Sequence, residues 1–475
     1  MKIDFENISG KYLYSLIVIF AAIPVLIFAG TPPFADDYSW LNFMESMEYN
    51  SIREFFTSAG PFGFYRPLFI ILMKIMFVFF GGYYLPYRVL AAILNVFTAL
   101  VIYRILHPRF YSRTVSFFSA VLFSVLAVHS EVLFIANCLN ILIADLLILA
   151  GIYCFSNNGK ISNYILSAVL FTFSLMFRES SVYYIPLLLV FYYFLKKRNM
   201  KKLMITSVFP IALYGALLIV AHPADYGNFY HKVGGVDLSI TGFLYKSFHF
   251  MLISFFPLKF VFYFFGFEYY DTLRSLISGG ENRTLFLIIA SFAGLFVSAV
   301  LFFVIRKLKS GIIFPLLIFL STVAVYLAGY HVAERFVFLA ALGTSVISVL
   351  FIIGFRSKKL SYVILVLFLL LHLSTLLLRG NSYENYSDNF ITSLRELHSK
   401  VQNDTSESNI LVHNLPVPVY GQVLISALNY NDAYKYYYPN SKKTFYLMNC
   451  LSNEEKQLPF TQTFRFNPET FTYTP

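Results

Sequence analysis

The chain has 475 residues, of which 58% are hydrophobic, 19% aromatic and only 13% charged, with a formal net charge of +11. Soluble domains average about 45–50% apolar and about 25% charged residues, so this composition excludes an ordinary soluble protein and indicates lipid as the main solvent. In a soluble protein such a positive charge would suggest nucleic acid as partner, but here the basic residues fall in short turns between apolar runs. The three cysteines show neither metal-ligand nor disulfide spacing.

Apolar segments long enough to cross a bilayer, which takes about 20 residues, recur along the chain. The first could pass for a signal peptide, but so many apolar segments follow it that we expect an uncleaved first span. Two further apolar runs, 66–81 and 247–266, are expected to be surface or re-entrant helices on the outer face. The eleven predicted spans are 11–29, 84–106, 113–130, 133–155, 161–177, 181–196, 203–222, 284–306, 312–330, 335–354 and 360–378.

The charges of the turns set the expected orientation. With the N-terminus inside, the inner turns are 107–113, 156–160, 196–202, 306–311 and 356–359. All five contain Lys or Arg, and none contains Asp or Glu, which is the positive-inside pattern. If 66–81 crossed the membrane alone, every later turn would invert and the KKRNMKK turn would face outward. We therefore predict a cytoplasmic N-terminus and an extracytoplasmic C-terminus.

The segment 379–475 differs from the rest because it is polar and has no spanning run. Within it, 408–416 predicts a short buried strand and 421–438 an amphipathic helix. We therefore expect an all-α polytopic membrane domain at 1–378, with about eleven transmembrane helices and outer-face surface helices. A small extracytoplasmic α/β domain is expected to follow at 379–475.

The acidic residues are distributed unevenly, since 22 of the 25 Asp and Glu are predicted to lie outside. Among them, Asp36 and Asp37 follow a Pro-Pro turn after the first span and precede an expected surface helix at 38–58. One of these carboxylates could take a proton from an acceptor hydroxyl while the other holds geometry or a cation. An Asp N-cap on the surface helix explains the pair about equally well.

Three outer turns each place an acid beside a cation at a membrane boundary. Arginine or histidine at this depth can hold a phosphate, and an arginine can do so through two hydrogen bonds. Snorkelling and local salt bridges explain any single turn better, but the turns together with the Asp pair favour a site. The residues concerned are His129 with Glu131, Arg178 with Glu179, and Glu334 with Arg335, while Arg66 adds a cation on the same side.

One acid, Asp145, lies inside the fourth predicted span, where Asn140 precedes it. A buried acid within a membrane is a candidate functional residue because its burial is costly. An interhelical hydrogen bond is the alternative explanation. We expect Asp145 to act through its neighbours rather than by contacting substrate.

At these residues the sequence resembles the GT-C superfamily of polyprenyl-phosphate-sugar-dependent glycosyltransferases. That superfamily includes protein O-mannosyltransferases and bacterial lipid A aminoarabinose transferases. The order and spacing of the motifs match over roughly 10–380. The motifs are the Asp36-Asp37 pair, YRPLFIILMKIMFVFFGG (65–82), HSEVLFIAN (129–137), FRESS (177–181) and ERFVFLAALG (334–343).

The resemblance implies an enzyme of the bacterial inner membrane that moves a sugar from a polyprenyl-phosphate donor to an extracytoplasmic acceptor. It implies that Asp36 is the general base, with Asp37 beside it. Phe134 stands where the family has tryptophan, and the family's Lys-Glu is Arg-Glu here, which leaves sugar and acceptor open. The resemblance leaves a divalent cation open as the cofactor, since an Asp pair suits the reaction with or without one. The residues expected to bind donor phosphate or substrate are Arg66, His129, Glu131, Arg178, Glu179, Glu334 and Arg335.

An envelope polysaccharide polymerase, ligase or flippase is the alternative, since such proteins are also polytopic and basic. A transporter places charges in mid-membrane and often shows repeated halves, whereas here the charges gather at one face. A polymerase is expected to carry a large outer loop with several Arg and His, but the loop at 223–283 has only two Arg. No nucleic-acid partner is expected.

Overall fold

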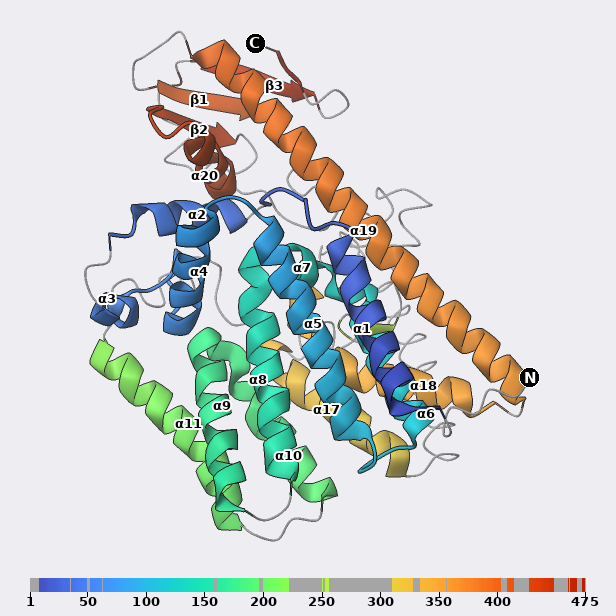
Figure 1. The fold of residues 1–475 in the computed structure, drawn as a ribbon. Helices are drawn as coiled ribbons and strands as arrows, with labels where there is room; N and C mark the ends of the chain where they lie inside the picture. Colours follow the sequence, from blue (N-terminus) through green and yellow to red (C-terminus); the bar gives the residue numbers. More distant parts are fainter. Residues whose placement is uncertain are drawn as a thin grey trace, which may run out of the picture.

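The protein is largely helical, and most of its helices run side by side in one bundle (Figure 1). Helices α1, α5, α8, α9 and α11 form a row in which each packs against the next. The computed structural model describes residues 8–34, 36–48, 52–61, 63–157, 160–195, 200–221, 250, 253–255, 310–327, 334–355, 357–402, 408–413, 427–447, 460, 462–467 and 472–474.

Helices occupy ten of the eleven predicted spans. The remaining one, 284–306, lies outside the described residues, as does most of the predicted surface segment 247–266. The ten helices are α1 (Gly10–Leu26), α5 (Leu85–Leu106), α6 (Arg113–Val125), α8 (Leu139–Ser156), α9 (Ile161–Phe177), α10 (Tyr184–Phe194), α11 (Met200–Ala221), α17 (Ser310–Leu327), α18 (Ala341–Ile353) and α19 (Lys358–Val401).

Length and composition support an integral membrane protein. Within the described part of the chain, four helical stretches are long and apolar enough to cross a membrane. These are Leu85–Leu106, Ala136–Ser156, Met200–Ala221 and Lys358–Val401. A fifth results if the bent pair Arg113–Val125 and Ala127–Phe134 forms one span. The other apolar helices are shorter, so the total of eleven spans stays a prediction.

Small and polar side chains allow the bundle to pack closely. The buried Asn95 of α5 donates hydrogen bonds to the carbonyls of Ala21 in α1, at 3.0 Å, and Ser124 in α6, at 3.1 Å, and so joins three helices. At Gly343 of α18 an added Cβ would lie 2.3 Å from the carbonyl oxygen of Pro315 in α17. Only glycine permits this approach, because a normal contact is well over 3 Å.

The outer surface segment consists of two helices rather than the single one expected at 38–58. They are α2 (Asp36–Ser46) and α3 (Ile52–Thr57). Helix α4 (Pro67–Phe80) coincides with the predicted surface helix and packs against both. Its Lys74 donates hydrogen bonds to the carbonyls of Met44, at 2.7 Å, and Met47, at 2.8 Å. A lysine at this place satisfies carbonyls that the end of α2 leaves without intrahelical partners.

The turn after α6 is folded into short helices inside the protein. They are η1 (Ala127–His129), α7 (Ser130–Phe134) and η2 (Ala136–Cys138), and the chain bends by 44° between α6 and this stretch. Every residue from Val115 to Leu142 is buried. The turn predicted between the third and fourth spans therefore forms part of the core of the bundle.

Helix α19 connects the bundle to a small sheet: its N-terminal part lies beside the bundle, and its C-terminal end lies at the sheet (Figure 1). Its 44 residues extend about 66 Å, roughly twice the thickness of a bilayer core, so the helix is longer than a single span requires. The sheet has the order β2-β1-β3-β4, with β1 parallel to β2 and β3. Its elements are β1 (Ser408–His413), α20 (Ala427–Tyr437), β2 (Lys443–Leu447), β3 (Gln462–Asn467) and β4 (Thr472–Thr474).

Candidate active site

The two predicted catalytic residues begin helix α2, in its first turn. Carboxylates are favoured there because the N-terminal end of a helix carries partial positive charge. The carboxylate of Asp36 lies 3.9 Å from the guanidinium of Arg335, and the two side chains are 27% and 28% exposed. This contact joins residues 299 positions apart and leaves both groups open to a ligand at the surface of the bundle.

Asp37 faces the interior and is fully buried. Its carboxylate accepts hydrogen bonds from the backbone amides of Asn137, at 2.8 Å, and Phe34, at 3.2 Å. Burial raises the pKa of Asp37 to about 6, although the charge of Arg88 and the backbone amides act against this shift. Because these contacts tie the start of α2 to the turn before it and to η2, Asp37 fixes the position of Asp36.

Arg88, a residue that we did not single out from the sequence, lies beneath this pair. It belongs to α5, is 1% exposed and has its guanidinium 5.5 Å from the centre of the Tyr84 ring. Among the described residues, its Nε and Nη2 atoms find no hydrogen-bond partner. A buried guanidinium needs a counter-charge, and the nearby carboxylate of Asp37 supplies it. An arginine within an apolar span was the signal in the sequence.

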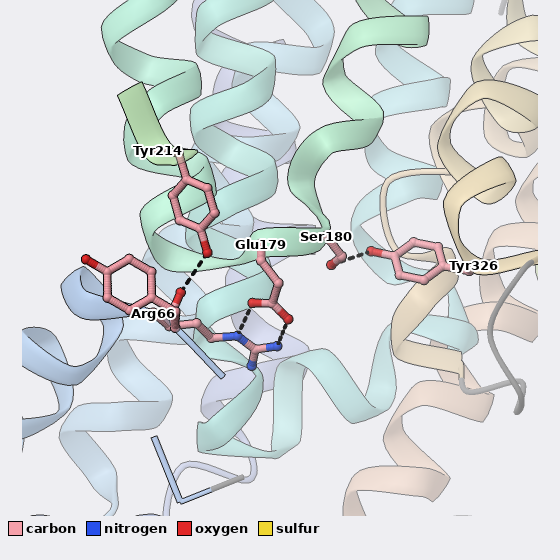
Figure 2. Close-up of polar contacts among 6 residues, drawn as sticks. Arg66, Glu179, Ser180, Tyr214 and Tyr326 are labelled. Atoms are coloured by element: carbon pink, nitrogen blue, oxygen red, sulfur yellow. Dashed lines mark hydrogen bonds and ion pairs between the residues drawn. The ribbon is translucent and has the colours of Figure 1, made fainter. Parts of the chain in front are cut away.

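A second cluster forms around Glu179, which begins the short helix η3 (Glu179–Tyr183) after α9. Nε and Nη2 of Arg66 donate to the two carboxylate oxygens of Glu179 at 2.7 and 2.8 Å (Figure 2). The side chains are only 12% and 14% exposed. Burial alone would raise the pKa of Glu179, but Arg66 and the neighbouring Arg178 outweigh it and lower that pKa. Two residues from separate predicted turns are thus held together as one unit.

Neighbouring hydrogen bonds fix this unit in place. The hydroxyl of Tyr214 in α11 donates to the carbonyl of Tyr65 at 2.9 Å, next to Arg66 (Figure 2). Ser180 and Tyr326 lie within hydrogen-bond distance through their hydroxyls, at 3.2 Å. These bonds connect the Arg66 segment to α11, and η3 to α17, so both partners of the ion pair are anchored by the bundle.

Two aromatic rings connect this cluster to the Asp pair. Tyr326 of α17 and Phe336 of η4 (Glu334–Val337) stack with ring centres 4.7 Å apart. The guanidinium of Arg178 lies 5.4 Å from the Tyr326 ring and 5.8 Å from the Phe336 ring. On Phe336 the guanidinium of Arg335 approaches to 5.7 Å as well. Two arginines therefore share one ring, which brings two positive charges close together.

Three further predicted residues occupy different settings. His129 is fully buried, with its ring against Phe123, at 4.6 Å, and Phe338, at 4.3 Å. Among the residues that the structure describes, its ring contacts are to these two aromatic residues and not to another predicted phosphate ligand. Glu131 is also buried but lies near Arg335. Glu334 begins η4, and the structure describes its backbone only.

The surroundings of Arg335 keep it charged. Burial alone would lower its pKa, but Cys138, Glu131 and Asp36 outweigh burial and raise that pKa. In the described part of the chain, no three His, Cys, Asp or Glu side chains gather as a metal site. In the contact between Asp36 and Arg335, the carboxylate can accept a proton and the permanent cation can stabilise an anion.

Asp145 also contributes to this region. Its carboxylate accepts a hydrogen bond from the hydroxyl of Tyr183 in η3. Arg178 lies close enough for the two charges to interact. Asn140, which precedes Asp145 in α8, is buried as well. The hydrogen bond between Tyr183 and Asp145 is the interhelical bond considered from the sequence, and it holds η3 against α8.

The family model described as "Dolichyl-phosphate-mannose-protein mannosyltransferase" matches residues 63–224. The expected resemblance to the GT-C superfamily is confirmed. The matched region contains Arg66, Arg178 and Glu179 but ends before Arg335, and it begins after the Asp pair. No curated protein matches the chain. The match, together with the apolar helices, supports a membrane glycosyltransferase of the GT-C type.

Proposed function

We propose that the protein transfers a sugar from a polyprenyl-phosphate carrier to an acceptor on the extracytoplasmic side, with Asp36 as general base. The observation that carries this proposal is the contact between Asp36 and Arg335, at 3.9 Å. In this contact a carboxylate that could accept a proton lies beside a guanidinium at the surface of an apolar bundle. Both partners are about one-quarter exposed, so an acceptor hydroxyl and a phosphate can approach them together.

The proposed transfer is a substitution at the anomeric carbon of the sugar. The acceptor oxygen forms a bond to the anomeric carbon of the sugar, while the bond from that carbon to the phosphate oxygen breaks. Asp36 takes the proton of the acceptor hydroxyl. The departing polyprenyl phosphate carries away the electron pair and gains negative charge, which Arg335 stabilises. Arg178 provides a second positive charge near the leaving phosphate, because its guanidinium and that of Arg335 contact the same ring of Phe336.

The proposed donor fits the position of the site. A polyprenyl chain requires lipid, and its phosphate lies at the depth of the headgroups. Helix α4 presents an apolar outer face, with Val78 68% and Phe79 74% exposed. Arg66, the residue before α4, lies at the opposite end of this helix and pairs with Glu179. We infer that the arginines bind the phosphate of the donor, whose tail extends from it into the lipid.

The orientation is proposed on the same grounds. The basic turn between α5 and α6 lies at the end of the bundle opposite α2 and α20 (Figure 1). By the positive-inside rule this end is cytoplasmic, so the Asp pair and the small sheet are extracytoplasmic. We further propose that the protein lies in a bacterial inner membrane. Its acceptor is then a protein, a lipid or an envelope glycan.

The test is a transfer assay with the protein in lipid nanodiscs. It uses several synthetic polyprenyl-phosphate sugars with membrane extract as acceptor, and the release of polyprenyl phosphate is measured. We expect release that depends on acceptor and is lost in Asp36→Asn. A flippase would instead move intact donor across the membrane without cleaving it. In closed proteoliposomes, donor translocation without release of the sugar would therefore refute the proposal and favour the alternative.

A further inference from the structure

The C-terminal segment rests on the helix that carries the Asp pair. Helix α20 packs against α2, as Figure 1 shows at the outer end of the bundle. The contact is polar at its centre and aromatic at its edge. Nothing in the proposed chemistry requires this segment, so its close contact with α2 calls for a physical role.

Asp432 lies at the centre of this contact. Its carboxylate accepts a hydrogen bond from the hydroxyl of Ser39, and its backbone carbonyl accepts one from the side chain of Asn42 at 2.7 Å. Ser39 and Asn42 are three residues apart and so lie on one face of α2. Ser39 is likewise three residues after Asp36, so the anchored turn directly follows the turn that carries the proposed base.

Aromatic side chains surround these hydrogen bonds. The hydroxyls of Tyr38 and Tyr437 are 3.4 Å apart, and the Tyr38 ring contacts the rings of Tyr436 and Tyr437 with centres 6.0 and 5.9 Å away. Tyr436 also reaches the turn between α4 and α5, where its hydroxyl lies 1.7 Å from the place of a Cβ on Gly82. Helix α20 therefore contacts both α2 and the turn that precedes α5.

Helix α20 is itself held from the other side. Asn431 exchanges two hydrogen bonds with the backbone of Phe445 in β2, at 2.7 and 2.8 Å. The hydroxyl of Tyr434 lies 2.9 Å from Nδ1 of His398 in α19. Adjacent residues of α20, 431 and 432, thus connect the sheet to α2. A displacement of the sheet or of α19 would reach α2 through Asp432.

We propose that Asp432 is a positioning residue, through which the C-terminal segment holds α2 and thereby Asp36 in the geometry that transfer requires. This inference rests on the proposed function, because the position of α2 matters to chemistry only if Asp36 acts in transfer. A proton acceptor must lie within hydrogen-bond distance of its hydroxyl, and a shift of about 1 Å can lower a rate by about 10²-fold.

The test compares Asp432→Ala with Asp432→Asn in the full-length protein. Alanine removes the acceptor for Ser39, whereas asparagine keeps a side-chain oxygen at the same place. We expect Asp432→Ala to lower kcat about tenfold or more, with donor KM changed less than about twofold, and Asp432→Asn to retain most of the activity. Glu396→Ala is the matched control, because Glu396 pairs with Lys400 within α19 and should leave kcat unchanged.

Hydrogen exchange provides the readout that does not depend on the reaction. In Asp432→Ala, the amides of α2 should exchange faster while those of α8 keep their rates. Ser39→Ala removes the same hydrogen bond from the α2 side and should reproduce the effect if Asp432→Ala cannot be purified. Unchanged α2 exchange, unchanged kcat, or equal loss in the alanine and asparagine variants would overturn the positioning role. Full activity of Asp36→Asn would instead refute the proposed base, and the exchange result would still decide whether α20 holds α2.

Discussion

The ion pair between Arg66 and Glu179 can be removed in a way that should restore the stability of the protein without restoring its transfer activity. The pair has two short hydrogen bonds, at 2.7 and 2.8 Å, and both side chains are at least 85% buried. Removing one partner of such a pair leaves a buried charge without its counter-charge, which costs about 3–5 kcal/mol. Replacing both partners by apolar residues of similar volume is often neutral. Glu179→Met should therefore be clearly destabilised, whereas Arg66→Met/Glu179→Met should regain most of the stability.

Transfer activity should not follow that recovery. If Arg66 binds the donor phosphate, the double variant lacks a ligand for it and stays impaired although it is stable. Thermal unfolding in detergent measures stability, and release of polyprenyl phosphate in nanodiscs measures activity. Wild-type activity in the double variant would show that the pair is purely structural. Wild-type stability of Glu179→Met would contradict the energetic argument.

Three further predictions concern charge and orientation. Arg335→Gln should lower turnover about 10²–10³-fold, as loss of a donor to a developing anion does, and a loss below about threefold would contradict its role. Because burial raises the pKa of Asp37 from 3.8 to about 6, the folded state binds its proton more tightly than the unfolded state. The stability of the wild type relative to Asp37→Asn should therefore fall by about 3 kcal/mol between about pH 3 and about pH 7. A difference in melting temperature between the two proteins that is the same at both pH values would refute this. Cysteines placed at the exposed Ser46 and Lys201 should react with impermeant reagent from outside and inside respectively, and reversed labelling would overturn the orientation.

The helices of the bundle could be predicted because a span must be continuously apolar. Their ends agree with the predicted ranges to within a few residues for α5, α9 and α11. The extension of α19 to Val401 was missed, since hydropathy falls after residue 378. The signal that could have found it is the helical spacing of the buried Phe390, Leu394, Leu397 and Val401. In a polar segment a helix is recognised by this amphipathic spacing, because its sequence is no longer continuously apolar.

The site could be predicted only in part, because its contacts join distant segments. The acid and cation of each turn were recognised, but the actual partners come from different turns: Arg66 pairs with Glu179 and Asp36 with Arg335. The buried setting of His129 could not be anticipated, since the 44° bend that places its turn in the core depends on tertiary packing. Local sequence thus identified the residue types, while the fold determined their partners.

The most direct measurement compares donor binding and turnover for Asp36→Asn. The substitution keeps the size of the side chain and removes its ability to accept a proton. Equilibrium binding of a polyprenyl-phosphate sugar should stay within about threefold of wild type, while turnover should fall about 10²–10⁴-fold. Turnover that stays near the wild-type value, with an intact fold, would contradict the assignment of Asp36 as the base of a glycosyl transfer.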